Sequence, residues 1–288
     1  MKSVNSKPKA ASQIAPDHTT PYPANAFAFH SVTATAREKG SKTLVEVGVG
    51  HGNALSTFSS SGLEVFGFDN NPEMVANSQA KAAELGLPAD RFALGSLEDE
   101  AAFAETAASG PFDLLVAMGV LPHIPEPASR RAALTNVRSL LNPGGYAFIE
   151  FRNSLFSLFT FNRYTFEFIM DDLLAEVPES IRSIVAADLR PRLEMERPPR
   201  SGPGVTMSGF DNPLEVPALF TEAGFTDVET IYFHFHAGPP FLEERDPAGF
   251  RAACHALEED GSSWRGMFLA SAFLIKARAP LDDSGHTP

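Results

Sequence analysis

The sequence predicts an α/β fold in which helices cover both faces of a mostly parallel sheet. Short apolar segments alternate with helix-like segments between residues 24 and 151, a spacing typical of strand–helix–strand units. A glycine-rich loop joins the first apolar segment to the helix after it. The chain of 288 residues is long enough to bury a full core, and its single cysteine, Cys254, excludes an internal disulfide.

The alternating segments follow one another in a regular order. The predicted helices are residues 24–39, 53–60, 72–85, 98–107 and 127–141. The predicted strands between them are residues 43–47, 63–68, 91–94, 112–118 and 146–151. Pro72 in the first turn of its helix and Gly86 just after its end are typical helix boundaries. In such sheets ligands bind outside the carboxyl ends of the strands, so every loop after a strand is a candidate site.

The alternation stops after the fifth strand. Residues 152–212 are too long for a simple connection, and we interpret them as a helical lid insertion with helices at 154–174 and 180–189. Residues 213–279 are expected to complete the sheet. Their predicted elements are a helix at 214–223, a strand at 227–236, a helix at 246–259 and a closing strand at 267–277. Residues 1–23 and 280–288 are expected to be a flexible leader and tail.

The net charge and the hydropathy of the sequence limit the kinds of partner that the protein is expected to bind. The chain has 23 basic and 36 acidic residues and a net charge of −13, which disfavours binding to DNA or RNA. No apolar run approaches the about 18 residues of a membrane span. The polar N-terminus has no signal-like apolar region. These features predict a cytoplasmic protein that binds neither nucleic acid nor membrane; its oligomeric state stays open.

The glycine-rich loop has the sequence Val45-Glu-Val-Gly-Val-Gly-His-Gly-Asn53. Its spacing is G-x-G-x-G, whereas dinucleotide-binding dehydrogenases use G-x-G-x-x-G. Glu46 before the first glycine would repel a pyrophosphate and suit a cationic ligand. Asp69 follows Gly48 by 21 residues, at the end of the second predicted strand, where a carboxylate can accept two hydrogen bonds from a ribose. The alternative is a tight strand–helix turn that binds no ligand.

Two further motifs follow at matching distances. They are Phe112-Asp-Leu-Leu-Val116 and Leu140-Leu-Asn-Pro-Gly-Gly-Tyr146. With the glycine loop and Asp69, the set resembles the class I S-adenosylmethionine-dependent methyltransferases, strongly over residues 41–153 and loosely over 213–279. The resemblance implies a Rossmann-like, doubly wound sheet of about seven strands with an antiparallel last strand. Residues 24–151 would then be the cofactor-binding core.

The resemblance also implies where S-adenosylmethionine binds. Glu46 and the glycine loop would hold its amino-acid end, Asp69 its ribose, and the loop after the third strand its adenine. The implied cofactor-binding residues are Glu46, Gly48, Val49, Gly50, Gly52, Asp69, Asn70, Ser96, Leu97, Met118 and Gly119.

The segment after the fourth strand indicates the branch of the family. It reads Met118-Gly-Val-Leu-Pro-His123 and lacks the N/D-P-P-Y/F motif typical of enzymes that methylate amide or base nitrogens. It also lacks the acids that magnesium-dependent members carry there, so we predict no metal. The stretch resembles enzymes that methylate small metabolites, as in secondary metabolism. His123 is a candidate general base, with loop packing as the alternative.

The acceptor site is predicted around the insertion. Six phenylalanines lie between residues 151 and 168, interleaved with arginine and tyrosine. Such a lining suits an apolar or aromatic acceptor that carries an anionic or polar group. The candidate substrate-binding residues are Tyr22, Arg152, Asn153, Phe159, Arg163, Tyr164, His234 and His236. The alternatives are that the phenylalanines pack in the core, that Glu150 and Arg152 pair with each other, and that the two histidines lie at a solvated edge.

The sequence therefore predicts methyl transfer from S-adenosylmethionine to a small-molecule acceptor, to oxygen or nitrogen rather than carbon. Two alternatives stay open. One is another use of the cofactor, such as aminopropyl transfer or intramolecular cyclisation. The other is a non-catalytic protein that binds S-adenosylmethionine.

Overall fold

A computed structural model describes residues 25–98, 103, 107–124, 126–156, 163–193, 209–237 and 246–281. The predicted leader, most of the predicted tail and most of the helix predicted at 98–107 lie outside the described residues.

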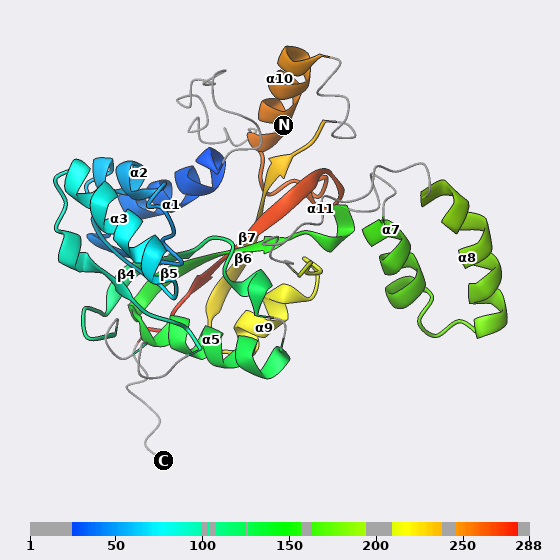
Figure 1. The fold of residues 1–288 in the computed structure, drawn as a ribbon, viewed down its shortest axis with the longest axis horizontal. Helices are drawn as coiled ribbons and strands as arrows, with labels where there is room; N and C mark the ends of the chain where they lie inside the picture. Colours follow the sequence, from blue (N-terminus) through cyan, green and yellow to red (C-terminus); the bar gives the residue numbers. More distant parts are fainter. Residues whose placement is uncertain are drawn as a thin grey trace, which may run out of the picture.

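A seven-stranded sheet forms the centre of the protein (Figure 1). Its strand order is β3-β2-β1-β4-β5-β7-β6. The first five strands run parallel, and β7 is antiparallel to both β5 and β6, which confirms the predicted topology. The strands are β1 (Thr43–Val47), β2 (Glu64–Asp69), β3 (Phe92–Leu94), β4 (Phe112–Ala117), β5 (Leu141–Arg152), β6 (Thr226–Phe235) and β7 (Ala270–Arg278).

Helices cover both faces of the sheet. One face packs on α1 (Ala26–Lys39), α2 (Leu55–Ser60) and α3 (Pro72–Glu84). The other packs on α5 (Pro127–Ser139) and α9 (Val216–Glu222). In Figure 1 the first group lies at the left and the second below the sheet. The remaining elements of the body are η1 (Ala89–Arg91), η2 (Leu121–His123), η3 (Ser154–Phe156), α10 (Pro247–Glu258) and α11 (Gly266–Leu269).

The register of the parallel strands places their carboxyl ends at one edge. Val47 at the end of β1 pairs with Phe68 of β2 and with Ala117 of β4. Ala117 in turn pairs with Ile149 of β5. The loops that leave β1, β2 and β4 therefore meet at the same edge, as the sequence predicted for a ligand site.

Two strands begin several residues away from their predicted starts. β5 begins at Leu141 rather than Tyr146, and its pairing with β4 is irregular between Phe112 and Leu114. A Cβ on Gly145 would lie 2.9 Å from the carbonyl oxygens of Asn142 and Asp113, so this irregular pairing needs glycine. The closing strand begins at Ala270, because the residues predicted as its start form α11 instead.

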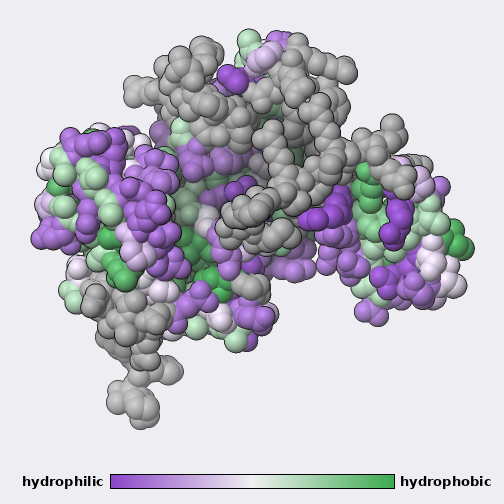
Figure 2. All heavy atoms as spheres, viewed as in Figure 1, coloured by the Kyte–Doolittle hydropathy of each residue, from purple (hydrophilic) through white to green (hydrophobic). Residues whose placement is uncertain are grey.

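The described part of the insertion forms a helical arm, residues 163–193. It consists of α7 (Arg163–Glu167), the π-helical turn η4 (Phe168–Leu173) and α8 (Glu179–Leu193). The Arg182 guanidinium on α8 donates to the Met170 carbonyl oxygen at 3.0 Å and so joins its helices. The arm stands apart from the sheet at the right of Figure 1. Apolar side chains reach its surface (Figure 2), with Ile181 49% and Ile184 70% exposed.

Candidate active site

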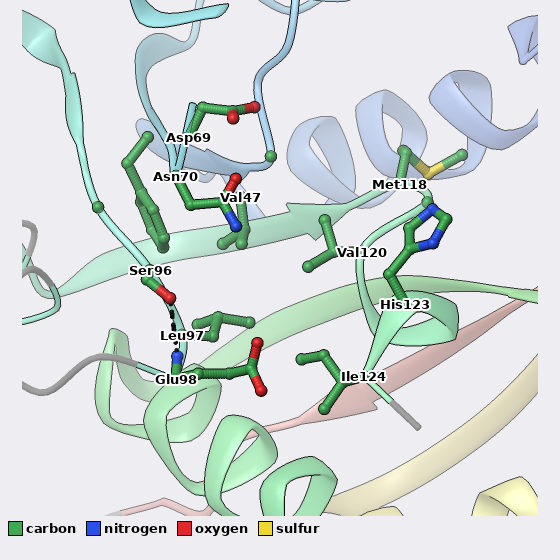
Figure 3. Close-up of a pocket in the computed structure, with 14 residues that line it drawn as sticks. Val47, Asp69, Asn70, Ser96, Leu97, Glu98, Met118, Val120, His123 and Ile124 are labelled. Carbon is green, nitrogen blue, oxygen red and sulfur yellow. Dashed lines mark hydrogen bonds between the residues drawn. The ribbon is translucent and has the colours of Figure 1, made fainter. Parts of the chain in front are cut away.

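A pocket of about 270 Å³ lies where the loops after β1, β2, β3 and β4 meet. Figure 3 shows Asp69, Asn70 and Ser96 on one side of it and Met118 and His123 on the other. The lining residues are Val47, Gly48, Phe68, Asp69, Asn70, Gly95, Ser96, Leu97, Glu98, Met118, Gly119, Val120, His123 and Ile124.

The glycine loop after β1 has the left-handed backbone that the sequence pattern indicated. Gly48, Gly50 and Gly52 have φ values of +70°, +53° and +73°. A Cβ on Gly48 would lie 2.5 Å from Val120 Cγ2, and a Cβ on Gly52 2.9 Å from Leu55 Cδ1. Near Gly50 the closest atom would be 3.9 Å away. The first and third glycines are therefore required for packing, whereas the second leaves room beside the loop.

Asp69 joins the end of β2 to this loop. Its Oδ2 accepts a hydrogen bond from the Gly50 amide at 3.0 Å, and its Oδ1 accepts one from the Asn71 amide at 2.9 Å. Each carboxylate oxygen has a second lone pair, which can accept a hydrogen bond from a ligand in the pocket. The carboxylate is thus held in place by the backbone while it lines the pocket.

Glu46 is a buried acid beneath the glycine loop, with 5% of its surface exposed. Burial, and secondly the negative charge of Asp69, raises its pKa to about 8. Within the described part of the chain, its Oε2 has no hydrogen-bond partner. A buried carboxyl group with an unsatisfied oxygen is costly unless a cationic or hydrogen-bonding partner joins it.

The loop after β3 contributes a residue that sequence reasoning missed. The Ser96 hydroxyl accepts a hydrogen bond from the Glu98 amide at 3.1 Å and shapes this loop. The Glu98 side chain points into the pocket beside Leu97 (Figure 3). Its place just after the third strand was the only available signal. The other lining residues that were not predicted are Val47, Phe68, Gly95, Val120 and Ile124.

The loop after β4 carries His123. This residue ends the short turn η2, is exposed, and lies beside Met118 at the pocket (Figure 3). Gly119 adopts φ +67°, and its amide donates to the buried Glu150 carboxylate on β5. Burial raises the pKa of Glu150, while the nearby Arg152 guanidinium, 3.9 Å from its Oε1, opposes that shift. The pairing of Glu150 with Arg152 that the sequence left open is therefore present.

Four implied cofactor residues do not line the pocket itself. Val49 is 3% exposed and packs in the core, so only its backbone belongs to the loop. Gly50 and Gly52 form the far side of the loop, and Glu46 lies beneath it. The remaining seven, Gly48, Asp69, Asn70, Ser96, Leu97, Met118 and Gly119, line the pocket.

Asn153, predicted to bind substrate, belongs to the framework instead. Its side chain is buried, and its Nδ2 donates to the carbonyl oxygens of Met267 at 2.9 Å and Ala270 at 2.7 Å. Its Oδ1 accepts from the Leu155 amide at 3.0 Å. The amide group is fully engaged in holding α11 and the start of β7, so it is not available to an acceptor.

His234 near the end of β6 and His236 just after it lie at the same edge of the sheet but do not line the pocket. His236 is buried, its Nε2 lies 3.2 Å from the Ser271 hydroxyl, and its ring packs on Phe156 with centroids 4.8 Å apart. His234 has φ +57°, a left-handed backbone within β6, and the pairing with β7 keeps its register on both sides at Phe233 and Phe235. His236 is therefore part of the packed interior rather than a solvated edge.

The remaining substrate candidates are Tyr22, Phe159, Arg163 and Tyr164. Tyr22 and Phe159 fall outside the described residues, as does the Tyr164 side chain. Arg163 Nε lies 3.3 Å from Glu167 Oε1 on the helical arm, which stands away from the sheet (Figure 1). In this arrangement the described arm does not cover the pocket.

The described ranges contain neither a metal-binding cluster nor a membrane-spanning helix. There, no three His, Cys, Asp or Glu side chains gather as a group that could hold a metal ion. No helix of that part of the chain is long and apolar enough to cross a membrane.

Comparison with known proteins agrees with the site. The family described as "Methyltransferase domain" matches residues 23–230. That stretch is most of the chain, and it contains the glycine loop, Asp69 and the loop after β4. The chain therefore belongs to this family, the class I S-adenosylmethionine-dependent methyltransferases, and S-adenosylmethionine is the cofactor of the class.

The individual proteins that resemble this chain share about a third of its residues or fewer over the matched parts. A ubiquinone biosynthesis O-methyltransferase of Xanthomonas axonopodis pv. citri is 34% identical over 122 residues, which are 42% of this chain and 47% of the relative. One from Thiobacillus denitrificans is 33% identical over 112 residues, 39% of this chain and 45% of the relative. The chain thus matches about half the length of these curated relatives. A solved S-adenosylmethionine-dependent methyltransferase from Methanosarcina mazei is 16% identical, with a TM-score of 0.49 over 84% of this chain and 94% of that one.

Proposed function

We propose that the protein transfers a methyl group from S-adenosylmethionine to a hydroxyl oxygen of a small, largely apolar or aromatic acceptor. The observation that carries this proposal is a pocket lined by the glycine loop and by the backbone-anchored Asp69, with Glu46 buried next to it on β1 and its Oε2 without a hydrogen-bond partner in the described part of the chain. A tight turn that binds no ligand has no use for an unsatisfied buried acid, because the burial costs free energy.

The residues present fit the cofactor. Glu46 suits the ammonium of its amino-acid end, because a cation beside the unsatisfied Oε2 compensates the buried carboxylate. Asp69 has free lone pairs for the ribose hydroxyls. Glu98, whose carboxylate points into the pocket, can accept a hydrogen bond from the amino group of adenine. When bound, S-adenosylmethionine supplies the electrophilic methyl group.

In this proposal His123 is the general base that removes the proton of the acceptor hydroxyl. Its imidazole is exposed at the pocket beside Met118 and can accept the proton of an acceptor hydroxyl as that oxygen is methylated. Apolar side chains of Met118, Val120 and Ile124 line the same wall and help to exclude water. The protein's contribution is then alignment, exclusion of water and proton removal.

The names of the relatives support methylation of oxygen rather than nitrogen. The curated proteins that match this chain are named O-methyltransferases of ubiquinone biosynthesis. We extend to this chain only the class of acceptor, a small molecule with a hydroxyl on an apolar body. The expected place in secondary metabolism finds no support in those names and stays a prediction, as does an anionic group on the acceptor.

A panel assay tests the proposal. The full chain is incubated with S-adenosylmethionine and matched phenols, catechols and anilines, and products are followed by mass spectrometry. We expect methylated phenol or catechol and one S-adenosylhomocysteine per product. Methylthioadenosine in place of S-adenosylhomocysteine would show aminopropyl transfer or cyclisation. Tight binding of S-adenosylhomocysteine with no product across the panel would favour a non-catalytic binding protein.

A further inference from the structure

A partly buried ion pair joins α5 to the segment by which the insertion returns to the sheet. Arg130 of α5 pairs with Asp211, and the two side chains are 16% and 8% exposed. Arg130 Nε also donates to the Ile124 carbonyl oxygen at 2.7 Å. One guanidinium therefore bonds to two acceptors on different segments, which lysine, with a single nitrogen, reproduces poorly.

The return segment, residues 209–211, is itself tied to the loop after β4 and to the end of β5. The Gly209 amide donates to the Pro122 carbonyl oxygen at 2.8 Å. The Asp211 amide donates to the Arg152 carbonyl oxygen at 2.7 Å, and the Asp211 carbonyl oxygen accepts from Ser154 at 3.0 Å. The segment thus runs beside the end of β5 like a short added strand.

This segment approaches the loop closely at Gly209. A Cβ on Gly209 would lie 3.1 Å from the Pro122 carbonyl oxygen and 3.5 Å from Arg130 Nη2. A side chain at this position would therefore require the segment or the Pro122 carbonyl to shift by a few tenths of an ångström.

These contacts fix both neighbours of His123. The carbonyl oxygen of Pro122, just before it, is held by Gly209, and that of Ile124, just after it, is held by Arg130. The histidine ring itself stays exposed at the pocket while Ile124 is 4% exposed. The backbone on either side of the ring is therefore anchored from outside the loop.

We propose that Arg130 is a positioning residue, which with Asp211 and Gly209 clamps the loop after β4 and so sets where His123 lies at the pocket. The same contacts join the return segment of the insertion to the loop after β4, so a displacement of one is expected to displace the other. The inference rests on the proposed role of His123 for its catalytic consequence, whereas the anchoring of the loop can be tested without it.

The test compares Arg130→Gln with Arg91→Gln. Arg91 also forms an ion pair, 3.0 Å from Glu64 Oε2, and stacks over Phe66, but it lies before β3 at the opposite end of the sheet. For each variant we measure amide hydrogen exchange of residues 119–124, S-adenosylhomocysteine affinity, and kcat and KM with an acceptor found in the panel assay. Arg130→Gln is expected to speed exchange of the loop at least 10-fold and to lower kcat about 10- to 100-fold. S-adenosylhomocysteine affinity should change less than about fivefold, and Arg91→Gln should leave all of these quantities near the wild type.

Two further variants keep the test decisive if Arg130→Gln unfolds. Gly209→Ala disturbs the clamp from its other side, and Arg130→Lys keeps the charge but loses the separate guanidinium nitrogens that reach the two acceptors; both should speed loop exchange and lower kcat. Loop exchange and kcat equal to wild type in folded Arg130→Lys and Gly209→Ala, with only a lower melting temperature, would overturn the proposal. If His123→Gln leaves turnover intact while the clamp variants still loosen the loop, the assignment of His123 fails and the clamp stands.

Discussion

The carboxylate of Asp69 acts on the buried Glu46 of the neighbouring strand: its negative charge adds to burial in raising the pKa of Glu46 to about 8. Asp69 keeps two backbone hydrogen bonds, whereas Glu46 Oε2 has none within the described ranges. The two acids are therefore unequal. One is anchored and lines the pocket, and the other is a buried group that a cationic ligand would ionise.

This inequality predicts how cofactor binding depends on pH. A cationic ammonium beside Glu46 favours the charged carboxylate, so binding of S-adenosylhomocysteine below about pH 8 should release a proton and strengthen as pH rises toward that value. Calorimetry in buffers of different ionisation enthalpy measures the released proton directly. Glu46→Gln should bind more weakly and abolish the proton release; an unchanged release would assign it to another group.

The raised pKa of Glu46 also predicts how the stability of the free protein depends on pH. Stability should fall as pH rises, whereas cofactor binding should strengthen. A carboxyl whose pKa is higher in the folded state than in the unfolded chain stabilises the fold below the unfolded value of 4.5, and this contribution is lost as pH rises toward about 8. Each pKa unit corresponds to about 1.4 kcal/mol. Chemical denaturation of wild type should show stability falling over this range, and Glu46→Gln should flatten the curve. A parallel fall in the variant would remove Glu46 as the cause.

The glycine loop offers a matched pair of substitutions. Gly48 and Gly40 have nearly the same backbone, φ +70° and +68°, but a Cβ on Gly48 would meet Val120 at 2.5 Å, whereas a Cβ on Gly40 meets nothing within 4 Å. Gly40→Ala should cost only the left-handed strain, about 1–2 kcal/mol of unfolding free energy. Gly48→Ala should cost more and also weaken S-adenosylhomocysteine binding. Equal costs and equal affinities would show that crowding at the loop does not matter.

Asn153 should behave as a framework residue. Asn153→Ala leaves the carbonyl oxygens of Met267 and Ala270 without their side-chain donor, and each unpaired buried group costs about 1–3 kcal/mol. The melting temperature should fall, while cofactor affinity and acceptor KM of the folded protein should stay close to wild type. A rise in acceptor KM without loss of stability would return Asn153 to the acceptor site.

Metal independence remains a prediction from the sequence of the loop after β4. Its Met118-Gly-Val-Leu-Pro-His123 stretch carries no carboxylate. Prolonged dialysis against EDTA should leave turnover unchanged, and added Mg²⁺ should not raise it. Loss of turnover in EDTA that Mg²⁺ restores would place the protein among the magnesium-dependent members.

The parts of the site that the sequence predicted are local in the chain. A left-handed turn and a strand end are encoded by neighbouring residues. The sequence therefore indicated both the glycine loop with Gly48, Gly50 and Gly52 and the position of Asp69 at the end of β2. The parallel direction of most strands followed from the same local alternation, and the antiparallel last strand from the family resemblance.

The parts that the sequence missed depend on contacts between distant residues. Asn153 reaches the carbonyl oxygens of Met267 and Ala270, more than a hundred positions away. Arg130 meets Asp211, which is 81 positions along the chain. No neighbouring residue in the sequence indicates these partners, so Asn153 was predicted to bind substrate and Arg130 was not singled out.

The binding of S-adenosylhomocysteine to Asp69 variants tests the central claim most directly, because it needs no acceptor. The claim is that the pocket between β1, β2, β3 and β4 holds the cofactor with Asp69 on its ribose. Wild type should bind one S-adenosylhomocysteine per chain in a calorimetric titration. Asp69→Ala should lose about 1.5–3 kcal/mol, roughly 10- to 100-fold in Kd, because two hydrogen bonds to a charged group are removed. An affinity unchanged by Asp69→Ala in a variant of native circular dichroism would contradict the account.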